Sequence, residues 1–169
     1  MHREPSKSIT DMSELLLGQL SFQRGAVLAK LDGLAPERLT ASVVPSGWTP
    51  LGLLNHLVHV ERRWIRWGFE AEDVVAPWGD CTPEAQWSGP DGDPAEVLTE
   101  LRRRWLRGGR HTEDVVKRHD LTDRAAAGGR FESDPPTLGW ILLHLIQEVG
   151  RHAGHLDIAR ELVDATVGE

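Results

Sequence analysis

The sequence predicts an all-α fold, a four-helix bundle with long loops between its helices. In four long segments, apolar residues recur at the spacing of three and four that is typical of helices, and no strand-like alternation is long enough to compete. Polar connections separate these segments, so each helix can pack its apolar face against the others. The length of 169 residues suits a single domain that spans residues 1–169.

The first helix is expected over about residues 8–31, where apolar residues form one stripe. Its members are Met12, Leu15, Leu16, Leu20, Val27, Leu28 and Leu31. Gly33 follows, and glycine is common just after the end of a helix. A short helix is expected next, at residues 36–40, within a polar connection.

The second helix has the clearest start. Thr49 is a good N-cap, and Pro50 falls at the first helical position, where its missing N–H costs nothing. The apolar pattern continues from there to about residue 71.

The third helix is expected over about residues 94–117. Because glycine is a poor helix former, Gly108-Gly109 should bend this helix or end it early. The fourth helix follows Pro135-Pro136, with Thr137 as its N-cap, and continues to about residue 163.

Two connections are long, at residues 74–93 and 119–136. Long connections in a compact bundle are either functional or disordered, and the sequence leaves both interpretations open. Cys81, the one cysteine, lies in the first of them. It cannot form an internal disulfide, and we expect it to be incidental to function.

Composition excludes several classes of function. The net charge of −7 argues against a nucleic-acid partner. Acidic residues interrupt the arginine-rich stretch between residues 102 and 124, which is interpreted as a solvated helix face. No apolar run approaches the roughly 18 residues that span a membrane. The polar first ten residues lack a signal-peptide core, so a cytoplasmic location is expected. A homodimer is compatible with a small bundle, but nothing in the sequence decides it.

The fourth helix carries a polar stripe formed by His144, Glu148, His152 and His155. At about 100° per residue these side chains share one face. Glu148 and His152 are four residues apart, the spacing with which one helix offers two ligands to one metal ion. An exposed Glu–His pair is the competing interpretation of the same spacing.

A third ligand would come from His56 or His59, which interrupt the apolar second helix. Two imidazoles and one carboxylate leave a coordination position open, which is typical of a catalytic site. Zn²⁺ is the preferred metal for this set, and Ni²⁺, Co²⁺ or Fe²⁺ would also accept it.

Trp48-Thr49 followed by His56, together with Glu148-x-x-x-His152, resembles the DinB-like superfamily of metal-binding four-helix bundles. Residues 151–161 resemble the terminal signature of actinobacterial members of one branch. That branch includes mycothiol-dependent maleylpyruvate isomerase and related thiol S-transferases. The resemblance extends from the first helix to about residue 164. An actinobacterial source also fits the excess of arginine over lysine, 16 to 3.

The resemblance implies that His56, Glu148 and His152 are the metal ligands. It also implies that the cofactor is a low-molecular-weight thiol such as mycothiol, presented to an electrophilic small molecule. No catalytic residue is assigned. The residues expected to contact the ligands or the substrate are His59, His144 and His155. Arg24 is a hypothesis for binding an anionic group of the cofactor, and four tryptophans could wall the pocket: Trp48, Trp78, Trp87 and Trp140.

Two other functions stay open at this stage. A hydrolase would use metal-bound hydroxide as its nucleophile, with one of the three remaining histidines as general base. In a non-catalytic stress or binding protein, the metal would only join the helices, and its removal would greatly lower the melting temperature.

Overall fold

The computed structural model describes residues 3–83 and 87–166, and their helices form a bundle. Within these ranges β-structure is limited to two isolated bridges. The predicted all-α bundle is therefore confirmed. The elements are α1 (Met12–Leu31), α2 (Pro36–Leu39), α3 (Pro50–Trp64), η1 (Ile65–Phe69), α4 (Pro94–Arg118) and α5 (Leu138–Asp164).

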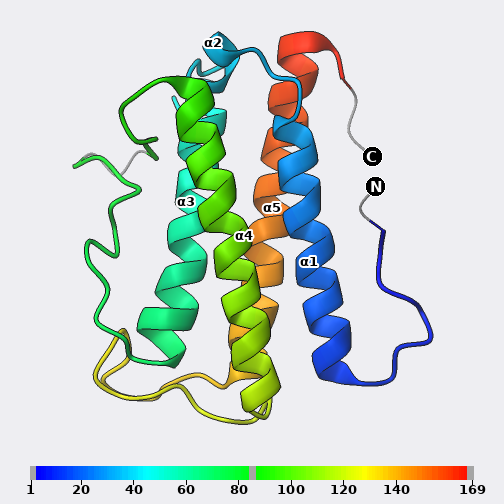
Figure 1. Ribbon diagram of the computed structural model, residues 1–169, viewed down its shortest axis with the longest axis vertical. Helices are drawn as coiled ribbons and strands as arrows, with labels where there is room; N and C mark the ends of the chain where they lie inside the picture. The colour runs from blue at the N-terminus through cyan, green and yellow to red at the C-terminus, as the bar shows by residue number, and fades with distance from the viewer. Residues whose placement is uncertain (1–2, 84–86, 167–169) are drawn as a thin grey trace.

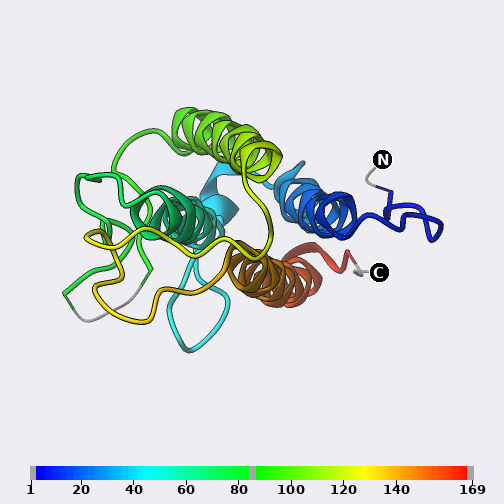
Figure 2. The same ribbon diagram turned by 90° about the horizontal axis from the view of Figure 1, so that it is seen from below.

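The four long helices occupy the corners of a square when viewed along the bundle (Figure 2). Helices α1 and α5 run in one direction, whereas α3 and α4 both run in the opposite direction (Figure 1). Because α3 and α4 are parallel neighbours, the chain between them must return along the full length of the bundle. This topology explains the length of the connection at residues 74–93, of which residues 84–86 lie outside the described residues.

Polar caps fix where the long helices begin. Thr49 Oγ1 accepts a hydrogen bond from Gly52 N at 3.0 Å, and Thr137 caps α5 in the same way, so both predicted N-caps are confirmed. The predicted start of the first helix at residue 8 is wrong. Asp11 accepts a hydrogen bond from Glu14 N at 2.8 Å, and α1 begins only after this cap.

The predicted early end at Gly108-Gly109 is also wrong, because α4 continues through both glycines to Arg118, whereas the predicted bend there stays a prediction. Both positions face a buried ion pair between Arg24 of α1 and Glu61 of α3. A Cβ at position 109 would lie 3.4 Å from Arg24 Nη1, and one at position 108 would lie 3.4 Å from Glu61 Oε2. These are ordinary van der Waals distances, so α4 packs directly against the pair at both positions.

Helix α3 ends in a π-helical turn, η1, close to the expected limit at residue 71. The connection between α4 and α5 docks on this turn, where Arg130 N donates to Trp67 O at 3.0 Å. A Cβ at Gly129 would lie 2.2 Å from the same carbonyl, so only glycine fits at this crossing.

Nearly all of the first three turns of α3 are buried. The helix packs against α4 and α5, and the connection at residues 74–93 covers a further side of it (Figure 2). Apolar side chains fill the space between the helices, among them Val27, Leu53, Leu57, Leu101, Leu145 and Val149. Polar side chains of α3 that face inward must therefore find protein partners or a bound ligand.

Candidate metal centre

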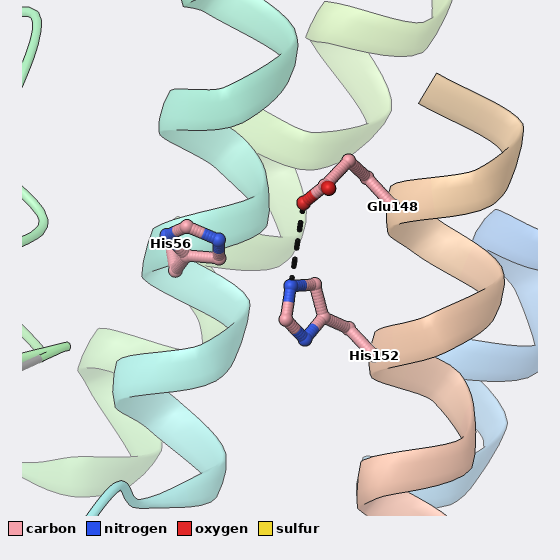
Figure 3. Close-up of side chains that lie close together, drawn as sticks. All are labelled: His56, Glu148 and His152. Atoms are coloured by element: carbon pink, nitrogen blue, oxygen red, sulfur yellow. Dashed lines mark ion pairs between the residues drawn. The ribbon is translucent and has the colours of Figure 1, made fainter. Parts of the chain in front are cut away.

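The structure brings His56 of α3 together with Glu148 and His152 of α5 (Figure 3). One nitrogen or oxygen atom from each side chain lies within 4.8 Å of the other two. His152 Nε2 is 3.5 Å from Glu148 Oε2, as the spacing of four on one helix predicts. His56 points at this pair from the neighbouring helix (Figure 3).

Burial differs among the three side chains. The side chains of His56 and His152 are 11% and 5% exposed, whereas that of Glu148 is 19% exposed. The cluster is therefore reached from solvent on its carboxylate side. Two imidazoles and a carboxylate at these separations fit a divalent ion of the zinc type, with a coordination position left over.

Asp80, a residue that the sequence did not single out, fixes the orientation of His56. His56 Nδ1–H donates to Asp80 Oδ2 at 2.8 Å, and this carboxylate is fully buried. The contact leaves the lone pair of Nε2 free for a metal ion, and metal-bound histidines ordinarily have such a partner. Because a metal-bound histidine needs such a partner, the acidic residues of the 74–93 connection could have been recognised as candidates for this role.

Arg63 stabilises the charge on Asp80. Its guanidinium group donates to both carboxylate oxygens, at 2.5 and 3.2 Å. Burial alone would raise the pKa of Asp80, but the hydrogen bonds from His56 and Arg63 outweigh it and hold this pKa far below its usual range. Asp80 is therefore an anion at neutral pH and holds His56 in one tautomer.

His152 is held as a neutral imidazole. Burial lowers its pKa to about 3, and the nearby charges of His56, His155 and Arg151 contribute in the same direction. Because a neutral ring is the form that binds metal, this environment suits a ligand. On the side away from Glu148, His152 Nδ1 lies 3.1 Å from His155 Nδ1.

Trp87 covers the two imidazoles from the 74–93 connection. Its ring stacks on His56 with a centroid distance of 4.3 Å and meets His152 edge-on at 4.7 Å. The backbone of Trp87 and Ser88 is anchored to α3, because Asn55 Nδ2 donates to Ser88 O at 2.8 Å and Gly52 leaves room for the carbonyl of Trp87. Trp87 therefore shields the histidine side of the cluster from water.

The three further histidines occupy different places. His155 contacts His152 directly, and its ring lies 6.0 Å from that of Trp48. His59 Nδ1 lies 3.8 Å from Asp80 Oδ1, so it contacts the residue behind His56. His144 packs between two tryptophans, at 4.3 Å from Trp64 and 5.4 Å from Trp140.

Arg24 lies in the core, 7% exposed, where it pairs with Glu61. This ion pair accounts for its position, and the cofactor-binding role stays a prediction. Cys81 follows Asp80 directly, and burial, with the charge of Asp80 next, raises the pKa of its thiol. A raised thiol pKa disfavours the nucleophilic thiolate. Trp78 lies away from the ligands, under the guanidinium group of Arg63 at 4.3 Å.

A second group, formed by Glu70, Glu72 and His111, also brings three donor atoms within 4.8 Å. Its members are already paired. His111 Nε2 lies 2.6 Å from Glu70 Oε2, while Arg66 lies 2.9 Å from Glu72. We therefore interpret this group as a surface ion-pair network.

A comparison with known protein families finds one whose model matches most of the chain. A family model described as mycothiol-S-transferase matches residues 15–165. No curated protein matches the chain. Among solved structures, the conserved protein of a locus from Enterococcus faecalis is similar in fold, with a TM-score of 0.61 at 14% identity. The alignment covers 94% of this chain and 100% of that one. Among the described helices, none is both long and apolar enough to cross a membrane.

Proposed function

The chain belongs to the mycothiol-S-transferase family, and from this premise we propose that it is a metal-dependent enzyme that joins a low-molecular-weight thiol to an electrophilic small molecule. The thiol would be mycothiol. The thiol gives up its proton to water, a sulfur–carbon bond forms, and the leaving group departs from the electrophile with its electron pair.

The metal would be held by His56, Glu148 and His152. The observation that carries this assignment is the convergence of their donor atoms within 4.8 Å of one another. Zn²⁺ suits this donor set best. A divalent ion bound there supplies positive charge that lowers the pKa of a coordinated thiol, so that the reactive thiolate is present at neutral pH.

The other side chains of the site have positioning and shielding roles in this proposal. Asp80 holds His56 with Nε2 directed to the metal position. Trp87 excludes water from the two imidazoles, which strengthens electrostatic interactions at the site. The thiol and the electrophile would approach from the more exposed side, where Glu148 lies.

A conjugation assay tests the proposal. Zinc-loaded protein is mixed with mycothiol and either monobromobimane or chlorodinitrobenzene, and the conjugate is quantified above the rate without protein. We expect turnover by the wild type and by Glu70→Gln, which alters the surface ion-pair network, but none by His56→Ala.

Equal rates for His56→Ala and the wild type would refute the metal-dependent mechanism. Product formation by the wild type without any thiol would instead favour hydrolysis.

A further inference from the structure

A second cavity, of about 400 Å³, lies between α3 and α4. Its lining includes Ile65 of η1 together with Glu61 and Arg62 of α3, which at 100° per residue lie on the far side of the helix from His56. We call it the α3–α4 cavity. Its volume falls within the range of small-molecule sites. None of His56, Glu148 and His152 lines it, but His59, which contacts Asp80, does.

Positive charge dominates the walls of the α3–α4 cavity, which include four arginines: Arg62, Arg66, Arg104 and Arg107. Arg66 and Arg104 pair with glutamates that lie outside the cavity lining, Glu72 and Glu100. Arg107 forms no ion pair with any residue in the described ranges. The one lining carboxylate, Glu61, already has Arg24 as its counter-ion.

The environment of Arg62 supports an excess of positive charge. Burial lowers its pKa, and the charges of Arg104, Arg66 and Arg63 lower it further. Its guanidinium group donates to the carbonyl oxygens of Val75 and Ala76, which are neutral partners. An anion in the cavity would relieve this repulsion and could form bidentate hydrogen bonds with guanidinium groups.

A buried acceptor also lines the cavity. Glu61 is 4% exposed, and its Oε1 accepts from Arg24 and Thr112. Its Oε2 has no hydrogen-bond partner among the described residues. This oxygen is also closed to water-sized groups, so Glu61 forms part of the cavity wall and is not a contact for a ligand.

We propose that the α3–α4 cavity binds a small organic anion. The carboxylate or phosphate of the ligand pairs with Arg62, Arg104 and Arg107. The site is independent of the metal centre and of the proposed thiol transfer.

Calorimetric titration of the full-length, zinc-loaded protein tests this assignment. The probes are glycerol 3-phosphate, glycerate, inorganic phosphate and glycerol. Glycerol 3-phosphate, glycerate and inorganic phosphate should bind, and glycerol, which carries no charge, should not bind. Arg107→Ala should weaken the binding of both organic anions by about tenfold, the effect of one charged hydrogen bond. Arg110→Ala is the matched control, because Arg110 is an exposed residue of α4 outside the cavity, and it should bind as the wild type does.

Three results would overturn the proposal. The first is no binding of either organic anion. The second is equal affinity for Arg107→Ala and Arg110→Ala. The third is loss of binding in His56→Ala, which would place the anion on the metal centre instead. Unchanged binding in His56→Ala is the expected result, whatever its effect on thiol conjugation.

Discussion

His56 Nδ1 lies 2.8 Å from Asp80 Oδ2, and this contact joins a histidine of α3 to the long connection between α3 and α4. Asp80 in turn is held by Arg63, which lies two helical turns beyond His56 on α3. The orientation of one proposed ligand therefore depends on a loop residue that is distant from the other two ligands in sequence.

Asp80→Asn should weaken metal binding. The substitution removes the charge that stabilises the Nδ1–H tautomer of His56, and loss of such a partner typically costs about 10- to 100-fold in metal affinity. Competition with a chromophoric zinc chelator measures this change. Asp134→Asn is the control, because Asp134 is an exposed acidic residue of the other long connection. Equal affinity in the two variants would show that Asp80 does not support the site.

Acid should destabilise the metal-free protein in a way that depends on His152. The pKa of this residue is lowered from 6.5 to about 3 in the folded state, so above pH 6.5 neither state binds its proton. As the pH falls below 6.5, only the unfolded state becomes protonated, and stability falls until the pH reaches about 3. Between pH 7 and 5 the loss from this group is roughly 2 kcal/mol.

Urea denaturation of metal-free protein at pH 7 and pH 5 measures this effect. His152→Gln should show a smaller decrease in unfolding free energy than the wild type, whereas His119→Gln, at a more exposed histidine, should retain the full decrease. The same decrease in all three proteins would contradict the assignment to His152.

Glu61→Ala should strongly destabilise the fold. It leaves Arg24 as a buried charge without its partner, and breaking a buried pair in this way costs roughly 3–5 kcal/mol. Urea denaturation at pH 7 measures the difference. Arg103→Ala removes one side of a solvent-exposed pair and should leave the unfolding free energy nearly unchanged. A Glu61→Ala protein as stable as Arg103→Ala would mean that the buried pair contributes nothing.

Trp87→Ala should speed the release of the metal without removing a ligand. Its ring covers His56 and His152, so its loss opens their side of the site to water and to chelators. Stopped-flow mixing of zinc-loaded protein with excess chelator measures the release rate. Trp140→Ala is the control, since Trp140 packs on His144 instead. Equal release rates would argue against a shielding role for Trp87.

Much of the fold could be predicted because its signals are local. Thr49 and Thr137 cap their helices through side chains three residues from the amide groups they satisfy. The continuation of α4 through Gly108-Gly109 could not be predicted, because the residues that pack against these glycines, Arg24 and Glu61, come from two other helices. At these two positions tertiary packing outweighs the low helix propensity of glycine.

In the candidate site too, contacts within one helix could be predicted from the sequence, whereas contacts between distant segments could not. Glu148 and His152 share one helix, so their spacing alone predicts that they meet. Periodicity could not choose between His56 and His59, because it does not give the rotation of one helix against another, and the family resemblance favoured His56. Asp80 and Trp87 depend on the path of a long connection, which no local pattern encodes.

Metal content measured by elemental analysis tests the central assignment most directly. Wild type, Glu148→Ala and Glu70→Ala are purified side by side, loaded with zinc and freed of unbound metal. The proposed site predicts stoichiometric zinc in the wild type and in Glu70→Ala, and almost none in Glu148→Ala. Full zinc retention by Glu148→Ala, or its loss from Glu70→Ala alone, would contradict the assignment of His56, Glu148 and His152 as the ligands.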